Sequence, residues 1–207
     1  MNISFKLIGF TLFLIMPGLV HSQSYSAGTH YSVIKKSTPS FNQEDVVEYF
    51  SYSCPGCFAM EPHIKSLEKN LPSIQLRRVH LPFGGTNAIL SQKAFVLLKL
   101  LKAEKHHDRI FNRIHIAKNV FDDQDELIGF FQGLGYEGSL VKSYLSSFAA
   151  DTLLRSMNLE AKKNQIGLAP TIIVRGKYLI DAGAVYSGTN LPDLVVYLMR
   201  LSDNEIH

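Results

Sequence analysis

The two cysteines of this chain lie three positions apart, in the segment Cys54-Pro55-Gly56-Cys57. The β-branched and aromatic run 46–52 predicts a buried strand just before them, and apolar residues at helical spacing predict a helix over 57–71. Pro55 suits a helix start, because it has no N–H to leave unpaired. The sulfur of Cys54 should therefore face the free N–H groups and the positive end of the helix dipole, which stabilise a thiolate.

A stabilised thiolate at Cys54 has a chemical consequence. Cysteines in such positions have pKa values from about 3.5 to 7.5, against about 8.5 for a free cysteine. Because a thiolate of low pKa is a good leaving group, its disulfide is readily attacked and tends to oxidise other dithiols. Cys54 and Cys57 are therefore predicted to form a redox-active disulfide.

Three other interpretations of the cysteine pair are open. A zinc site needs four ligands, and His63 and His80 would complete the set only at irregular spacing, since there is no second cysteine pair. A purely structural disulfide that closes so short a loop would gain little loop-closure entropy. The pair could also be two free thiols buried by chance. Redox chemistry is the favoured interpretation, and neither a metal nor a cofactor is expected.

The N-terminus has the pattern of a secretory signal peptide. Lys6 is the only charge among the first twenty residues, an apolar run follows over 7–16, and Val20 and Ser22 are small residues before a predicted cut. The alternative is a membrane anchor, but that run is about half the roughly 20 residues that a span needs. We expect residues 1–22 to be removed and the mature protein to be soluble in an oxidising compartment outside the cytoplasm, where two chance free thiols are less expected.

Composition limits the class of protein. The 207 residues carry a net charge of +3, with 46% hydrophobic and 19% charged side chains, which suits one folded domain with room for an insertion and argues against disorder. Lys and Arg are spread among Asp and Glu, without the basic cluster of a nucleic-acid binder. No nucleic-acid partner is therefore expected.

Hydrophobic periodicity predicts the order strand, strand, helix, strand, helical block, hairpin, helix. The helical block spans 86–166, and Arg175-Gly176 is the predicted two-residue turn of the hairpin. The remaining elements are strands over 31–34, 46–52, 74–80, 170–174 and 177–180 and helices over 57–71 and 191–198.

Two segments carry a family resemblance. The segment 48–58, with sequence Glu-Tyr-Phe-Ser-Tyr-Ser-Cys-Pro-Gly-Cys-Phe, resembles the active-site segment of the periplasmic thiol:disulfide oxidoreductases of the DsbA family. The segment 167–178 resembles the second signature of that family. The resemblance covers essentially the whole mature chain. It implies an α/β thioredoxin fold with an inserted all-helical domain, in which 23–85 and 167–207 form the thioredoxin-like part and 86–166 the insertion.

The resemblance also implies roles for single residues. Cys54 would be the exposed nucleophile that forms a mixed disulfide with a substrate protein, and Cys57 the buried partner that resolves it. Pro170 would be a cis-proline that faces the disulfide and helps to hold the substrate; the alternative is a trans proline that opens a strand. Glu48 would be a buried acid that relays protons to or from Cys57; the alternative is a solvated glutamate at a strand edge.

Neighbouring residues complete the implied site. Pro55, Gly56 and Ala169 would contact the substrate beside Pro170. Glu61 and Arg78 lie where the family often has a charge pair near the buried acid, and a plain surface pair is the alternative.

Two departures from the family pattern concern the redox potential. The chain has Pro55-Gly56 where the family usually has Pro-His, which removes a side chain able to act on the Cys54 thiolate. Ala169 replaces the Val, Thr or Ile that is common before the proline. The chemistry should be unchanged, and the strength of the oxidant is left open.

The predicted function is that of a dithiol oxidase that donates its disulfide to secreted proteins with free cysteines. The family implies reoxidation by a membrane quinone-linked partner of the DsbB type. Only residues 23–30 precede the first predicted strand, too few for the dimerisation domain of the related isomerases, which favours a monomeric oxidase. The alternatives are a disulfide isomerase or reductase of the same fold, and a peptide-binding chaperone that uses the groove near Pro170.

Three further predictions concern residues outside the cysteine motif. The segment 133–138 matches the dinucleotide-binding spelling G-x-G-x-x-G but follows a predicted helix, so we expect a turn between helices. His106 and His107 are expected to be a solvated loop pair. Candidates for an apolar substrate surface, any of which could equally belong to the core, are Phe58, Met60, Phe83 and Leu168.

Overall fold

The computed structural model describes residues 24–34, 45–83 and 87–201, so the predicted signal peptide, residues 1–22, lies outside the described residues. A five-stranded sheet has the strand order β1-β5-β4-β2-β3. Only the β2–β3 pair is parallel among the strand pairs of the described residues. The strands are β1 (Tyr31–Val33), β2 (Val46–Phe50), β3 (Leu76–His80), β4 (Thr171–Val174) and β5 (Tyr178–Ile180).

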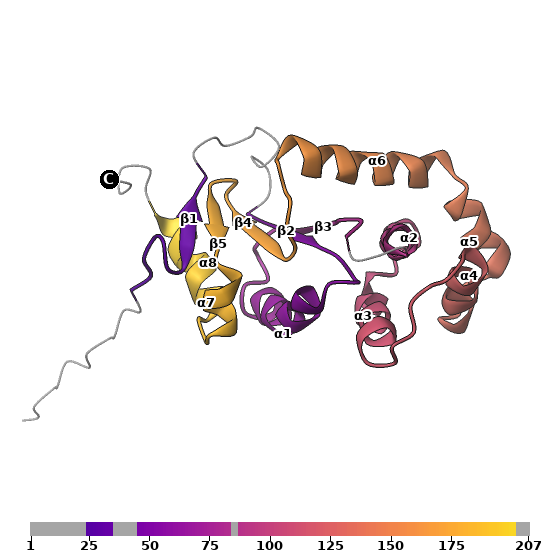
Figure 1. The fold of residues 1–207 in the computed structure, drawn as a ribbon, viewed down its shortest axis with the longest axis horizontal. Coiled ribbons are helices and arrows are strands. Elements are labelled where there is room, and N and C mark those ends of the chain that lie inside the picture. Colours follow the sequence, from indigo (N-terminus) through magenta and orange to yellow (C-terminus); the bar gives the residue numbers. More distant parts are fainter. Residues whose placement is uncertain (1–23, 35–44, 84–86, 202–207) are drawn as a thin grey trace, which may run out of the picture.

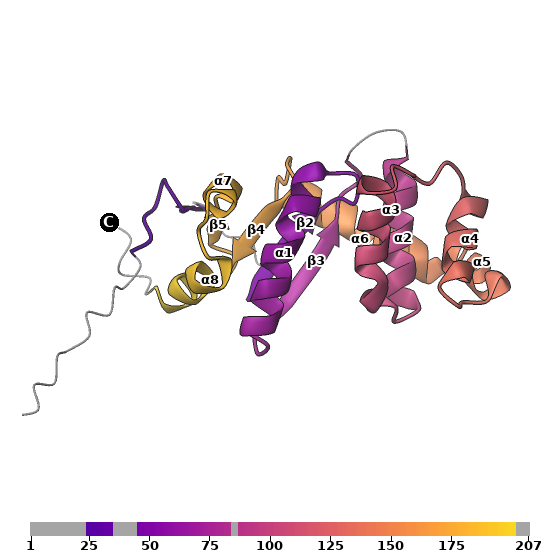
Figure 2. The same ribbon diagram turned by 90° about the horizontal axis from the view of Figure 1, so that it is seen from below.

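Helices cover the sheet and extend beyond one of its edges. They are α1 (Pro55–Asn70), α2 (Ala88–Leu100), the 3-10 helix η2 (Glu104–His106), α3 (His107–His115), α4 (Gln124–Gly133), α5 (Gly138–Leu145), α6 (Phe148–Lys163), α7 (Ala182–Tyr186) and α8 (Leu191–Arg200). Figures 1 and 2 show α1 and α8 on one side of the sheet, α6 on the other, and α2 to α5 beyond the β3 edge. In the described part of the chain, no helix is long and apolar enough to cross a membrane.

This architecture is the predicted thioredoxin fold with a helical insertion. Every helix from α2 to α6 lies between β3 and β4 along the chain. The division at 86–166 stays a proposal, because its first residue lies outside the described ranges. The hairpin turn is confirmed, since Arg175 and Gly176 both have positive φ. The five-residue helix α7 was not predicted, because so short a segment shows no clear helical periodicity.

Strand β2 runs through the middle of the hydrophobic core. All five of its residues are buried, as expected for a strand with neighbours on both sides and helices on both faces. One core cluster joins residues of β2 such as Tyr49 and Phe50 to the inserted helices, and a second cluster packs α1 and α8 against the sheet. The end of β2, where the cysteine motif begins, is thus held from both sides.

A polar cluster ties the last inserted helix to the sheet. The Tyr49 hydroxyl donates to Glu160 Oε1 at 2.7 Å, and Arg77 donates to both oxygens of Glu160 at 2.9 Å. Asn164 Nδ2 also donates to the Tyr49 hydroxyl, at 3.0 Å. Glu160 on α6 therefore joins the side chains of β2 and β3, and bidentate contacts of this kind are among the stronger protein hydrogen bonds.

We expect Glu160→Ala to lower the free energy of unfolding by about 1–2 kcal/mol, because Tyr49 and Arg77 would lose their partly buried acceptor. Urea denaturation measures the change. The control is Arg155→Ala on the same helix, which removes an ion pair whose side chains are 77% and 60% exposed and should cost less than about 0.5 kcal/mol. Equal losses in the two variants would show that the Glu160 cluster does not stabilise the fold.

Candidate active site

Cys54 and Cys57 lie where β2 gives way to α1, as the sequence predicts. Cys54 is the N-cap of α1, with an extended backbone, and its Sγ accepts a hydrogen bond from the Cys57 N–H at 3.3 Å. When Cys54 is protonated, its S–H donates to the Ala169 carbonyl oxygen, with Sγ and the oxygen 3.3 Å apart. Cys57 is fully buried and accepts from the Ser51 N–H at 3.5 Å. Both thiols are free, so this is the dithiol form.

The two thiols have opposite electrostatic environments. A hydrogen bond from the Cys57 side chain, helped by the backbone N–H groups of Cys57 and Gly56, outweighs burial and lowers the pKa of Cys54 to about 6. The same side-chain bond and burial raise the pKa of Cys57 far above that of a free thiol. At neutral pH, Cys54 is therefore largely a thiolate and Cys57 keeps its proton.

The second signature segment meets the first beside the Cys54 sulfur. The Ala169–Pro170 peptide bond is cis, as the family resemblance implied. A Cβ on Gly56 would lie 3.3 Å from Pro170 Cδ and 3.7 Å from Cys54 Sγ. The fold thus brings Cys54, Gly56, Ala169 and Pro170 together, and Pro55 is exposed at the first position of α1.

Glu48 is a fully buried acid on β2, which rules out a solvated glutamate at a strand edge. Its Oε2 accepts from Arg78 Nε at 3.0 Å, and its Oε1 is buried with no hydrogen-bond partner. Burial raises the pKa of Glu48 to about 7, although the charge and hydrogen bond of Arg78 oppose the rise. The Glu48 charge in turn raises the pKa of Cys57, so the two groups interact electrostatically.

The prediction that Glu61 and Arg78 form a charge pair is wrong, because each has other partners. Arg78 makes its ion pairs with Glu48 and, at 3.1 Å, with Glu68. Glu61 is buried and instead contacts His107 Nε2 at 3.1 Å. Arg78 on β3 faces Glu48 on the parallel strand β2, a register that brings these two side chains together.

His107 is also a correction, because it is buried and not part of a solvated loop pair. The Tyr52 hydroxyl and His107 Nδ1 are 2.6 Å apart, while Nε2 faces Glu61. An Nε2–H that donates to the carboxylate leaves Nδ1 to accept from Tyr52, which satisfies a neutral ring, and burial lowers the pKa of His107. The spacing of His107 from Ile110 and Ile114 on one helical stripe was a usable signal.

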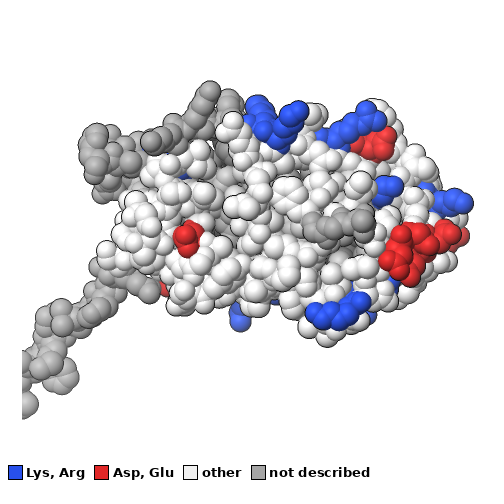
Figure 3. Space-filling view, viewed as in Figure 1, with Lys and Arg blue, Asp and Glu red and all other residues white. Residues whose placement is uncertain are grey.

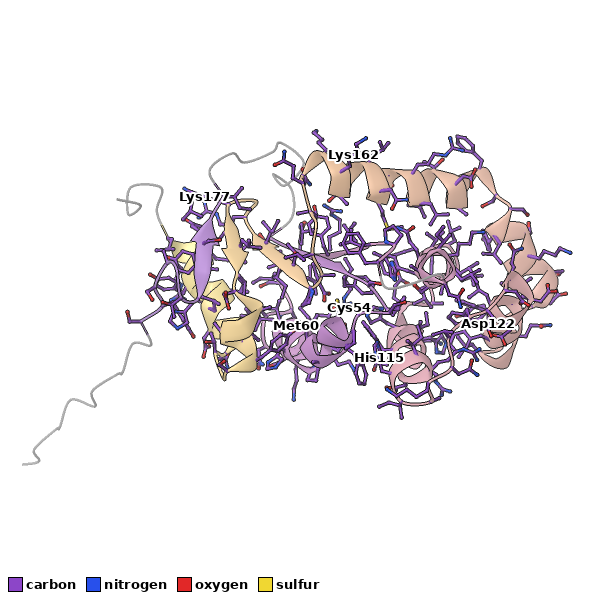
Figure 4. The ribbon with its side chains drawn as sticks, viewed as in Figure 1. Cys54, Met60, His115, Asp122, Lys162 and Lys177 are labelled. Atoms are coloured by element: carbon purple, nitrogen blue, oxygen red, sulfur yellow. The ribbon has the colours of Figure 1, made fainter. Side chains whose placement is uncertain are left out.

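Two more histidines lie near the cysteine motif. His80 is buried, its Nε2 accepts from the Tyr52 N–H at 3.0 Å, and burial lowers its pKa to about 3, so that nitrogen is not free for zinc. His115 Nε2 donates to the Tyr52 carbonyl oxygen at 2.7 Å, and its ring stacks on Phe58 with centroids 4.8 Å apart. Figure 4 shows His115 on α3 near Cys54 at the start of α1. No sequence pattern had indicated His115.

The candidates for an apolar substrate surface divide between surface and core. Leu168, next to Ala169, is 77% exposed, and Phe83 is 37% exposed. Phe58 is partly buried against the core, and Met60 is fully buried within it. Tyr186, which the sequence did not suggest, is 45% exposed beside Gly56.

The hydrogen bond between the two cysteine side chains gives a first prediction for the site. Relative to the dithiol form of the wild type, Cys57→Ala should raise the pKa of Cys54 from about 6 toward the free value, because the side-chain donor is lost. Cys57→Ser keeps a donor and should leave the pKa near that of the wild type. Alkylation rates of Cys54 across pH measure both values. An equal rise in both variants would rule out the side-chain bond as the main cause.

The raised pKa of Glu48 gives a second prediction. Because the folded-state pKa of about 7 exceeds the ordinary value of 4.5, the neutral acid stabilises the fold below pH 4.5, and this contribution is lost as the pH rises to 7. Gln does not titrate. The stability of Glu48→Gln relative to wild type should therefore rise by on the order of 3 kcal/mol between pH 4.5 and 7. Denaturation of the disulfide form of each protein between pH 4.5 and 7 measures this change. A difference in the free energy of unfolding that does not vary with pH would contradict a raised pKa.

Comparison with known proteins agrees with this geometry. The DSBA-like thioredoxin domain family matches residues 45–198. The thiol:disulfide interchange protein DsbA of Pseudomonas aeruginosa is 29% identical over 183 residues, which are 86% of this chain and 86% of that protein. The protein of the same name from Azotobacter vinelandii is 31% identical over 158 residues, 75% of this chain and 73% of that protein.

Solved structures show the same fold. DsbA of Klebsiella pneumoniae superposes with a TM-score of 0.76 at 20% identity, over 87% of this chain and all of that one. DsbA of Pseudomonas aeruginosa gives a TM-score of 0.67 at 27% identity, over 84% of this chain and 91% of that one. The chain therefore belongs to the DSBA-like thioredoxin domain family and is a protein thiol:disulfide oxidoreductase.

Proposed function

We propose that this protein is a periplasmic dithiol oxidase that donates its Cys54–Cys57 disulfide to secreted proteins. The observation that carries the direction of transfer is the place of Cys54 at the N-cap of α1, where its Sγ accepts from the Cys57 N–H. Hydrogen bonds at this position lower the pKa of Cys54 to about 6. Hydrogen bonds that stabilise the thiolate stabilise the dithiol form and leave the disulfide less stable by comparison. Electrons therefore flow from the substrate to the protein.

The exchange takes place in two displacements. A substrate thiolate attacks Cys54 Sγ, the Cys54–Cys57 bond breaks, and the Cys57 sulfur leaves with the electron pair and takes up a proton. A second substrate thiolate then attacks the substrate sulfur of the mixed disulfide, and Cys54 leaves as a thiolate. The substrate dithiol has lost two electrons and two protons; the cysteine pair has gained the electrons, and one proton stays on Cys57 while the other goes to water.

Glu48 is suited to supply the proton that Cys57 needs. Cys57 is fully buried and is displaced in a site where Glu48 is also fully buried. A carboxyl group with a pKa of about 7 is partly protonated at neutral pH, which suits a group that both gives and takes a proton. The buried Oε1 without a partner is the oxygen that is free to carry it.

Exposed apolar and aromatic side chains at the site suit unfolded substrates. Leu168, Phe83 and Tyr186 are exposed, and Pro55, Gly56, Ala169 and Pro170 would contact the substrate backbone beside them. On the face drawn in Figure 3, most charged side chains stand toward the top, bottom and right, and one acidic side chain stands on the left. DsbA of Proteus mirabilis has been solved with a non-covalently bound peptide, and we propose the same kind of ligand here.

The cellular setting follows from the same proposal. Cleavage after Ser22 would release the mature protein into the periplasm, where it would act as a monomer. Each turnover leaves the cysteine pair reduced, so a membrane quinone-linked reoxidase of the DsbB type would be needed to restore the disulfide.

Equilibration with glutathione tests the direction of electron transfer. We expect a reduction potential of the Cys54–Cys57 couple between about −120 and −200 mV, the range of strong oxidants and of protein disulfide isomerase. A potential near −270 mV, the thioredoxin value, would overturn the oxidase proposal and favour a reductase.

Turnover of a reduced substrate separates the oxidase from a chaperone. Cys54→Ser should end catalysed disulfide formation, whereas Ser53→Ala, at the neighbouring position, should retain it. A Cys54→Ser protein that keeps full cellular function would show that the groove near Pro170 acts by holding peptides.

A further inference from the structure

Tyr186, the last residue of α7, reaches the start of α1. Its hydroxyl donates to the Gly56 carbonyl oxygen, with the two oxygens 2.8 Å apart. The residue is 45% exposed and lies 130 positions from Gly56 along the chain, so only the fold brings them together. The disulfide exchange proposed above does not use this contact.

The bonded carbonyl belongs to the peptide unit that also holds the Cys54 sulfur. The Gly56 carbonyl and the Cys57 N–H are the two ends of one planar peptide group. That N–H donates to Cys54 Sγ at 3.3 Å. A donor at the carbonyl end withdraws electrons from the peptide, and hydrogen bonds linked in this way strengthen one another by roughly 10–30% each.

We propose that Tyr186 is a positioning residue that acts through the Gly56–Cys57 peptide to stabilise the Cys54 thiolate, and so makes the disulfide a stronger oxidant. The inference deepens the proposed function and rests on Cys54 and Cys57 being the reactive couple. Burial and the charges of Cys57 and Cys54 raise the pKa of Tyr186 to about 12. The hydroxyl therefore lies within the field of the cysteines and stays protonated as a donor at physiological pH.

Gly56 leaves the space that this contact requires. A Cβ at position 56 would lie 3.3 Å from the Tyr186 hydroxyl oxygen and 3.3 Å from Pro170 Cδ. The proline ring cannot rotate away, so a larger side chain at position 56 would displace the tyrosine hydroxyl. The hydrogen bond from Tyr186 therefore favours a residue without a side chain at position 56.

Tyr186→Phe removes the donor and keeps the ring. We expect the pKa of Cys54 to rise by roughly 0.3 to 0.6 units, which is about a two- to fourfold change in ionisation. The equilibrium constant with glutathione should change by the same factor, so the potential falls by about 9 to 18 mV. The control is Tyr136→Phe, the same chemical change in the turn between α4 and α5, which should alter neither value.

The pH dependence separates this role from a structural one. The difference in potential between wild type and Tyr186→Phe should vanish at pH 4, where Cys54 is protonated in both proteins and no thiolate is left to stabilise. Tyr186→Phe with an unchanged Cys54 pKa, or with an equal loss of stability in the disulfide and dithiol forms at all pH values, would overturn the proposal.

A second variant tests the route through Gly56. In a Gly56→Val background the hydroxyl should already be displaced, so Tyr186→Phe should produce no further shift; a full shift there would overturn the proposed route. The oxidase proposal and the role of Tyr186 are tested by different results. A wild-type potential near −270 mV would reject the oxidase, whereas the difference between wild type and Tyr186→Phe tests the tyrosine alone.

Discussion

The hydrogen bond from the first turn of α1 to the Cys54 sulfur depends on the position of that helix end, which several elements of the fold determine. Strand β2, buried along its whole length, delivers the chain to Cys54. Met60, Ile64 and Leu67 anchor α1 in the core beneath the sheet. The loop before β4 closes the other side of the sulfur through the Ala169 carbonyl oxygen. A small movement of any of these elements would change the hydrogen bonds at the sulfur.

Burying charged side chains near the cysteines costs desolvation free energy, which neighbouring groups partly offset. A carboxylate without water is expensive unless it is paired or takes up a proton. Glu48 does both in part, because Arg78 contacts one oxygen while burial favours the neutral acid. His107 contacts one oxygen of Glu61, and the Tyr52 hydroxyl in turn contacts His107. The acid–base properties of the site thus depend on residues from β2, β3, α1 and α3.

Local sequence patterns were enough to predict the parts of the site that neighbouring residues define. The strand-to-helix junction fixes Cys54, Pro55 and Cys57, because a buried strand and a helix start can both be recognised from short-range patterns. The family resemblance added Pro170 and the buried Glu48. The same reasoning could not tell that Met60 is in the core while Leu168 is exposed, because both are apolar residues next to the motifs.

Contacts between distant segments were outside the reach of sequence patterns. Arg78 was expected to pair with Glu61, and only the parallel register of β2 and β3 places it beside Glu48. His107 lies 46 positions from Glu61, and their contact depends on how α3 packs on α1. The role of α7 was also hidden, because a five-residue helix carries too little periodicity to identify.

The core shared by the sheet and the insertion bears on how the protein folds. Residues of β2 such as Tyr49 and Phe50 belong to the same apolar cluster as Leu127 and Val141 in the inserted helices. Neither part can lose its packing without exposing apolar surface of the other. Because they share this cluster, we expect the two parts to unfold in a single cooperative transition. The inserted helices form one continuous stretch of the chain, and we expect them to fold together with the sheet on which they pack.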